Sequence, residues 1–118
     1  MVSTFTVSTE IVENSIGLIH AMGEIDQSNL PDLESAVKLI LETPTLKAVV
    51  INCTDIAFIN SKVVGYIAYL HTTLVKSGRK LVLAAMNETL SDILALVGLT
   101  SIIPHYETWE EAVAKCKT

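Results

Sequence analysis

The segment KAVVINC, residues 47–53, constrains the fold more than any other part of the sequence. From Ala48 to Cys53 it is almost continuously apolar and rich in β-branched residues, and it is too short to make a good helix. Such a run is typical of an inner strand that is covered on both faces. A second run of this kind, KLVLAA, occupies residues 80–85. The two runs predict an α/β domain with KAVVINC at the centre of its sheet.

Four further segments have the pattern of amphipathic helices, with apolar residues recurring at a period near 3.6. In the first of them, Pro31 is acceptable because it falls in the first turn, where Ser28 or Asn29 can cap the helix. The predicted helices cover residues 30–41, 63–77, 88–97 and 109–116, and the inner face of the third consists of Leu90, Ile93, Leu94 and Val97.

Residues with special backbone or capping roles mark the ends of these helices. Asn87 is a suitable N-cap for the third helix, and Gly78 and Gly98 can supply the left-handed residue at which helices often end. The fourth helix begins with a capping box, in which Thr108 caps the helix and Glu111 returns a hydrogen bond to the cap residue.

Two strands are predicted before the first helix. TFTVSTEIV, residues 4–12, alternates polar and apolar residues, and SIGLIHAMG, residues 15–23, follows a turn-forming Glu-Asn-Ser triplet, so we expect an antiparallel pair. SIIPHY, residues 101–106, is a short strand that Pro104 places at an edge or an end. The order ββαβαβαβα, with right-handed crossovers, predicts one α/β domain over residues 1–118 with a mixed, mostly parallel sheet and about four helices.

Composition excludes several classes of partner. The formal net charge is −5 and the few basic residues are scattered, so the surface is expected to repel nucleic acid and anionic lipid. The amino terminus resembles no signal peptide, and no apolar stretch is long enough to span a bilayer. Cys53 and Cys116 have no metal-binding spacing and are expected to pack in the core. We therefore expect a cytoplasmic protein without metal or cofactor.

The segment FINSKVVGY, residues 58–66, joins the central strand to the second helix. After a short loop, Ser61 is expected at or near an exposed helix N-terminus, where free backbone N–H groups and the helix dipole favour an anion. A phosphate on Ser61 would be stabilised there. The alternative is that Asn60 and Ser61 only cap the helix. Lys62 is unusual in a first turn because its charge opposes the dipole.

A family resemblance covers nearly the whole chain. GEID at residues 23–26, DIAFINS at 55–61, Gly65, and the segment from KSGRKLVLAA to WEEAV at 76–113 resemble the STAS domains of anti-sigma factor antagonists. The resemblance implies that the unphosphorylated protein binds an anti-sigma factor, which is a serine kinase of the histidine-kinase-like ATPase fold. It also implies that phosphorylation at the position of Ser61 breaks the complex, and that a phosphatase restores it.

The phosphoacceptor motif departs from the family pattern at three positions. Asn60 stands in place of the usual Asp, Lys62 in place of a small hydroxyl residue, and Val63 in place of the usual Gly. Lys62 can either pair with a phosphoserine or block a kinase that expects a small residue. Asp26 matches a family position beside the phosphoacceptor, so it either contacts Lys62, belongs to the partner surface or caps the following helix.

The sequence offers less support for other functions. His20, His71 and His105 lie in separate elements, which makes an enzyme a weak hypothesis. Tyr66 and Tyr69 either line a binding surface with Lys62 or straddle the boundary of the core. The resemblance leaves two rivals to the switch, namely a STAS module that binds partners without phosphorylation, and a STAS-like subunit for a small ligand or a transporter assembly. A monomer or a weak dimer is compatible with the sequence.

Overall fold

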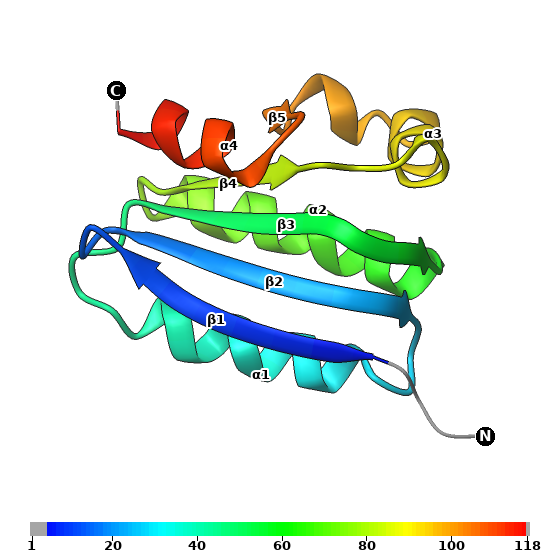
Figure 1. Ribbon diagram of the computed structural model, residues 1–118, viewed down its shortest axis with the longest axis horizontal. Coiled ribbons are helices and arrows are strands. Elements are labelled where there is room, and N and C mark those ends of the chain that lie inside the picture. The colour runs from blue at the N-terminus through cyan, green and yellow to red at the C-terminus, as the bar shows by residue number, and fades with distance from the viewer. Residues whose placement is uncertain (1–4, 118) are drawn as a thin grey trace.

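The computed structural model describes residues 5–117, and it confirms the predicted order of strands and helices (Figure 1). The predicted limits of the domain, residues 1 and 118, lie outside the described residues. The elements are β1 (Thr6–Val12), β2 (Ile16–Ile25), α1 (Leu30–Leu41), β3 (Ala48–Ile59), α2 (Ser61–Lys76), β4 (Lys80–Ala84), α3 (Glu88–Leu96), the 3-10 turn η1 (Leu99–Ser101), β5 (His105–Tyr106) and α4 (Trp109–Cys116).

The sheet has five strands in the order β1-β2-β3-β4-β5 (Figure 1). β1 is antiparallel to β2, whereas β2, β3, β4 and β5 are all parallel. The mixed, mostly parallel sheet and the central place of β3 are therefore confirmed. The predicted strand over residues 101–106 is mostly wrong, because Ser101 belongs to the turn η1 and only His105–Tyr106 form β5. β5 does lie at an edge of the sheet, as expected, and Pro104 directly precedes it.

β3 is longer than the sequence indicates. It continues past Cys53 to Ile59, and its second half pairs only with β2, with irregularities in the register between His20 and Met22 and between Gly23 and Glu24. The prediction of a loop before the second helix is therefore wrong. The polar Thr54 and Asp55 resemble a turn in the sequence, but here they are exposed residues of a strand. Because the strand runs to Ile59, a single residue separates it from α2.

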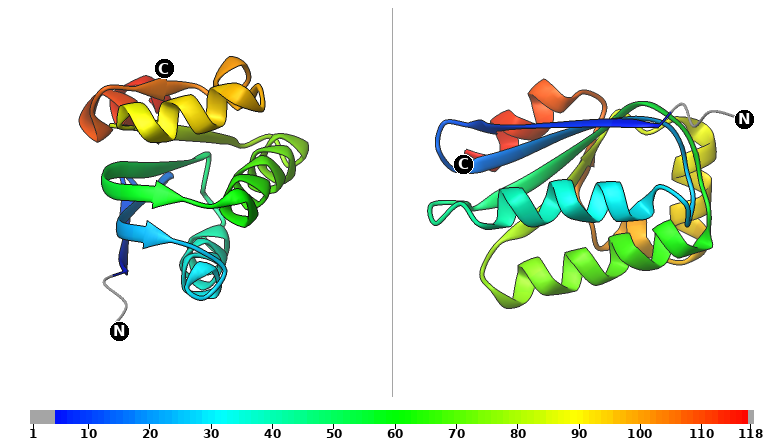
Figure 2. Two further views of the ribbon diagram at one scale, coloured as in Figure 1. Left: turned by 90° about the vertical axis from the view of Figure 1, so that its right-hand side faces the viewer. Right: turned by 90° about the horizontal axis from the view of Figure 1, so that it is seen from below.

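Helices cover both faces of the sheet (Figure 2). α1, α2 and α3 pack their apolar residues on one face, and α4 packs alone on the other. α1 and α2 lie side by side in both views, so the start of α2 adjoins the loop that leads into α1. None of the helices in residues 5–117 is long and apolar enough to cross a bilayer.

The helix ends confirm most of the capping predictions. Asn87 accepts a hydrogen bond from the Leu90 backbone N–H at 2.8 Å, and Gly78 and Gly98 have left-handed φ angles of 76° and 80°. The prediction that Val97 lies on the inner face of the third helix is wrong. The helix α3 ends at Leu96, and Val97, its C-cap residue, is 58% exposed.

The capping box of α4 is only half formed. Thr108 accepts a hydrogen bond from the Glu111 backbone N–H at 3.1 Å. The Glu111 carboxylate, however, accepts a hydrogen bond from the Glu107 backbone N–H at 3.3 Å. The prediction that it bonds to the backbone N–H of the cap residue Thr108 is therefore wrong.

Both cysteines pack in the core, as predicted. Cys53 belongs to the cluster under α1, α2 and α3, and Cys116 belongs to the cluster under α4. Burial raises the pKa of the Cys53 thiol to about 12, and it also raises the pKa of Cys116. Since the thiolate is the reactive form of cysteine, both residues are inert packing groups at neutral pH.

Candidate functional site

Helix α2 begins at Ser61, immediately after the N-cap residue Asn60. Asn60 is extended, and its side-chain oxygen accepts a hydrogen bond from the Val63 backbone N–H at 3.2 Å. Ser61 is exposed, and none of the hydrogen bonds within the described part of the chain involves its hydroxyl. The expected position of Ser61 at an exposed helix N-terminus is confirmed. The capping role belongs to Asn60 alone, which leaves the Ser61 hydroxyl accessible.

Asn60 also connects α2 to the loop between β2 and α1. Its side-chain N–H donates to the Gln27 side-chain oxygen at 2.6 Å, and its backbone N–H donates to the Ile25 carbonyl at 3.2 Å. Because Ile25 and Ile59 are paired across β2 and β3, residues 26 and 60 begin neighbouring segments at the same end of the sheet. An aspartate at position 60 would retain the cap but lose the N–H that reaches Gln27. Gln27 is a site residue that the sequence analysis missed, because no local pattern links it to position 60.

The loop between β2 and α1, which contains Asp26, is stabilised by hydrogen bonds of its own side chains. The Asp26 carboxylate accepts hydrogen bonds from the Ser28 hydroxyl at 2.5 Å and the Ser28 backbone N–H at 2.8 Å. These bonds lower the pKa of Asp26, so its carboxylate is charged and exposed at neutral pH. The ion pairs formed within residues 5–117 do not include one between Asp26 and Lys62. Asp26 thus presents its charge to solvent beside the start of α2.

The predicted side-chain cap of α1 is wrong. Asn29 occupies the N-cap position and is buried, but its side chain makes no capping bond to the helix. Its side-chain oxygen accepts from the Asp26 backbone N–H at 3.0 Å, and its side-chain N–H donates to the Glu24 carbonyl at 3.0 Å. Instead, the Asp26 carbonyl accepts from the Leu30 backbone N–H at 2.9 Å. Asn29 therefore stabilises the loop that carries Asp26.

Three residues continue from Ser61 along α2. Lys62, Tyr66 and Tyr69 are spaced so that they share one side of the helix, and the two tyrosine rings lie 6.4 Å apart. Tyr66 is half-buried against α1, and burial, followed by the charge of Glu34, raises the pKa of its hydroxyl to about 12. Tyr69 is 64% exposed and Lys62 is exposed. Tyr66 thus lies at the core boundary, while Lys62 and Tyr69 are available at the surface.

His20 is part of a polar network on the face of the sheet that α4 covers. Its Nδ1 lies 2.9 Å from the Asn52 side-chain nitrogen, and its Nε2 lies 3.3 Å from a Glu10 carboxylate oxygen. Asn52 must donate to Nδ1, because its side-chain oxygen already accepts from Thr54, and so Nε2 carries the proton that points to Glu10. The ring also meets Trp109 edge to face, with ring centres 5.7 Å apart. Through these contacts, His20 helps to pack α4 and β1 against this face of the sheet.

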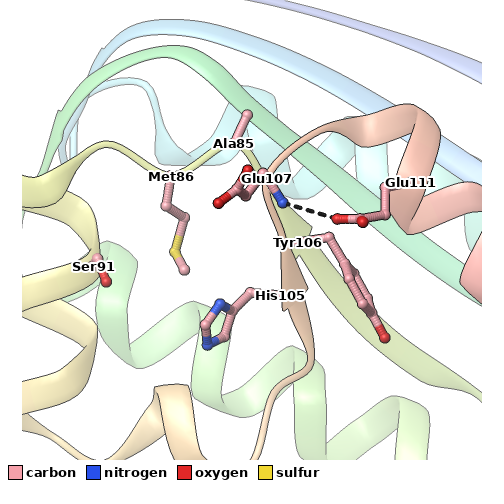
Figure 3. A pocket seen from close by; sticks show the side chains of 7 residues that line it. All are labelled: Ala85, Met86, Ser91, His105, Tyr106, Glu107 and Glu111. Atoms are coloured by element: carbon pink, nitrogen blue, oxygen red, sulfur yellow. Dashed lines mark hydrogen bonds between the residues drawn. The ribbon is translucent and has the colours of Figure 1, made fainter.

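A separate open hollow of about 740 Å³ lies at the carboxyl ends of β4 and β5 (Figure 3). Its lining includes His105, Glu107 and Ala85, and Ala85 has a left-handed φ of 59°. None of the five residues proposed for the site, Asp26, Asn60, Ser61, Lys62 and Tyr66, lines this hollow. The residues around Ser61 are therefore separate from this hollow.

Replacing Asn60 with alanine should lower the free energy of unfolding by about 1 kcal/mol, because the Val63 N–H loses its cap. Asn60→Asp should cost less, since a carboxylate keeps the cap and is favoured near the positive end of the helix. Urea unfolding of the two variants and the natural chain measures the difference. Equal losses in both variants would mean that the bond to Gln27, and not the cap, provides the stability.

Comparison with known proteins agrees with this structure. Residues 7–112 match the STAS domain family. An anti-sigma factor antagonist from Mycobacterium paratuberculosis is 23% identical, with a TM-score of 0.84 over 98% of this chain and 96% of that chain. The Bacillus cell fate determinant SpoIIAA, solved in its phosphorylated form, is 18% identical, with a TM-score of 0.74 over 93% of this chain and 98% of that chain.

The same fold also occurs within a larger protein. The murine anion transporter Slc26a9 contains a region that is 11% identical, with a TM-score of 0.78 over 98% of this chain but only 22% of the transporter chain. At these identities the structural likenesses establish the shared fold, while the family match covers most of the sequence. The chain therefore belongs to the STAS domain family and has the fold of the anti-sigma factor antagonists.

Proposed function

We propose that this protein is an anti-sigma factor antagonist-like regulator that binds an anti-sigma factor with serine kinase activity. The proposed contact surface consists of Asp26, Asn60, Ser61, Lys62 and Tyr66, and we call it the Ser61 face. Phosphorylation of Ser61 by the bound kinase would end the interaction, and a cognate phosphatase would restore it. The observation that carries the proposal is the exposed Ser61 hydroxyl at the first position of a 16-residue helix.

The environment of Ser61 suits both states of such a switch. Without phosphate, the Ser61 hydroxyl is small, neutral and exposed, so a protein surface can approach it. With phosphate, it gains about −1.5 to −2 charges. The free N–H groups of α2 and the dipole of the helix stabilise those charges, and the first turn contains no acidic residue to oppose them. Lys62, which follows directly, can rotate to pair with the phosphate.

The change in charge gives the switch its direction. Asp26 already presents a carboxylate beside the start of α2, so a partner that binds the unphosphorylated face must accept that single negative charge. A phosphoserine next to Asp26 would add further negative charge to the Ser61 face, and a partner surface that is complementary to one negative charge would then bind it less well. In the transfer itself, the Ser61 oxygen attacks the γ-phosphorus of ATP, ADP leaves, and a base on the kinase takes the hydroxyl proton. Hydrolysis by the phosphatase returns serine and inorganic phosphate.

A second candidate is a STAS module that binds its partner constitutively. It is favoured by the residues around Ser61, because Lys62 is bulky and Val63 is buried at the start of α2. A third, a subunit of a transporter assembly, is favoured by the presence of the same fold in Slc26a9. We prefer the switch because the Ser61 hydroxyl is accessible and unused by the fold. A kinase partner also agrees with a cytoplasmic location, with no contact to nucleic acid or membrane.

Incubation with ATP and a candidate anti-sigma factor that has serine kinase activity should add one phosphoryl group to the natural chain and none to Ser61→Ala. Intact-mass spectrometry measures the gain, and gel filtration with ADP in place of ATP should show a complex that phosphorylation dissolves. Lys62→Ser distinguishes the candidates. If only Lys62→Ser is modified, the lysine blocks the kinase and the constitutive module is the better description. If the kinase binds neither form, the proposed partner is wrong.

A further inference from the structure

Among residues 5–117, no strand pairs with the outer edge of β1. β1 pairs with β2 on one side only, and it is the longer of the two edge strands, with seven residues against two in β5. No described segment crosses its outer side when the molecule is viewed from below (Figure 2). Edge strands are usually shielded from other chains by lysine, proline or a bulge. The sequence TVSTEIV contains no lysine or proline, and its register with β2 is regular throughout.

Exposed apolar side chains and a hollow lie beside this edge. Ile11 on β1 is 40% exposed and Leu39 on α1 is 64% exposed. Together with Thr9 and Ile40 they line a hollow of about 310 Å³ between β1 and α1. An extended strand added to β1 would satisfy its unpaired backbone groups, and a side chain from that strand could fill the hollow.

We propose that the β1 edge pairs with β1 of a second copy of this chain, forming a two-fold dimer with one continuous sheet. When two copies of a strand pair antiparallel around a two-fold axis, one residue lies opposite the same residue of the other copy. For every other opposed pair, the two residue numbers add up to twice the number of that central residue. With Thr9 on the axis, all seven residues of the strand are paired. The opposed pairs are then Thr6 with Val12, Val7 with Ile11, Ser8 with Glu10, and Thr9 with Thr9.

The chemistry of these pairs favours a second copy over an unrelated strand. Val7 of each copy lies opposite Ile11 of the other, at the hollow beside Leu39, so two apolar contacts form symmetrically. Glu10 lies opposite a serine hydroxyl and not opposite the other Glu10. The neighbouring registers are worse, because an axis at Ser8 leaves Ile11 and Val12 unpaired within the strand, and an axis at Glu10 opposes two carboxylates.

The dimer leaves the Ser61 face uncovered by the second copy's β1. The contact is made by β1 and the exposed side of α1, whereas Ser61 lies at the start of α2, and α1 separates α2 from the β1 edge (Figure 2). Each copy carries a formal charge of −5, so the two repel each other, and the dimer should strengthen as salt screens that repulsion. A small edge contact of this kind corresponds to a weak dimer.

Sedimentation velocity of the natural chain over a concentration series should show a monomer that converts to a dimer, with tighter association at higher salt. Thr9→Lys should weaken the dimer about tenfold or more, because it places two like charges opposite each other at the axis. Thr72→Lys, on the exposed surface of α2, makes the same change in net charge and should leave association unchanged. A monomer at every concentration, or equal association of the two lysine variants, would overturn the proposal.

Cysteine cross-linking tests the register without relying on a destabilising variant. Thr9→Cys should form a disulfide-linked dimer under mild oxidation, because each residue 9 faces its counterpart across the axis. Ile11→Cys lies on the same face of β1 but opposite Val7, so it should link slowly. The two natural cysteines are buried and do not compete. Linking of Ile11→Cys as fast as Thr9→Cys would rule out the proposed pairing.

Discussion

Replacing Leu70 with alanine should lower the free energy of unfolding by about 2–5 kcal/mol. Leu70 lies in the middle of α2, is 2% exposed, and packs in the cluster between the helices and the sheet. The truncation loses the transfer free energy of the buried methyl groups and leaves a cavity that rigid neighbours fill only in part. A small domain has a total stability of about 5–15 kcal/mol, so the loss is a large fraction of it.

Leu96→Ala is the matched control for Leu70→Ala. Leu96 is the last residue of α3 and is 88% exposed, so the same change of side chain should alter the free energy of unfolding by about 0.5 kcal/mol or less. Urea unfolding followed by circular dichroism measures both. Because α2 carries Ser61, Leu70→Ala should also weaken the proposed binding at the Ser61 face at temperatures where the folded state is depleted. A loss below about 1 kcal/mol would mean that α2 does not depend on this contact.

Gly17→Ala should also destabilise the protein, by about 1–3 kcal/mol. Gly17 lies in β2 where α1 crosses closely, and a Cβ atom there would come within 2.3 Å of the Ile40 Cγ2 atom. Real Cβ atoms are essentially never found so close to another heavy atom, so either α1 or Ile40 must move. Moving α1 also disturbs its contacts with the sheet, since Leu33 and Val37 on the same helix are buried there.

Two controls separate this clash from a general effect of alanine. Gly65→Ala, in the exposed first half of α2, meets nothing within 4 Å and should stabilise the protein by about 0.5–1 kcal/mol, because alanine favours a helix. Ile40→Ala removes the clashing atoms, so the added cost of Gly17→Ala should fall in that background. Strictly additive losses in the double variant would show that the close approach is not the cause.

Much of the fold could be predicted because its signals are local. The continuous apolar run at residues 48–53 identified the central strand, and the 3.6-residue periodicity located the helices. Capping chemistry acts within one turn, so Asn87 and Thr108 were assigned correctly as caps, and left-handed glycines ended α2 and α3 as expected. The errors lie where a distant contact overrides a local preference. Asn29 turns away from the helix to bond Asp26 and Glu24, and β3 continues through Thr54 and Asp55.

The candidate site, too, could be predicted only in part from the sequence. The pattern of small polar residues before a helix placed Ser61 at an exposed N-terminus, because that position depends only on where the helix begins. The roles of Ser61 and its neighbours in binding stay predictions. The bond between Asn60 and Gln27 joins residues 33 positions apart, and it forms only because β2 and β3 are adjacent. No local pattern in the sequence could indicate it.

Local signals in the sequence were enough to predict the α/β class, the order of elements, the central strand and an exposed helix N-terminus at or near Ser61, although the helix itself begins two residues before the predicted start at residue 63. These follow from side-chain periodicity and from capping groups, which act over a few residues. The tertiary structure was needed to show how far β3 runs, why Gly17 must be small, and that Asn60 bonds to Gln27. It was also needed to show that β1 has no partner strand on its outer side within residues 5–117. The physical reason is that these features depend on which strands become neighbours and how closely a helix packs on them. Those contacts join residues that are far apart in the chain.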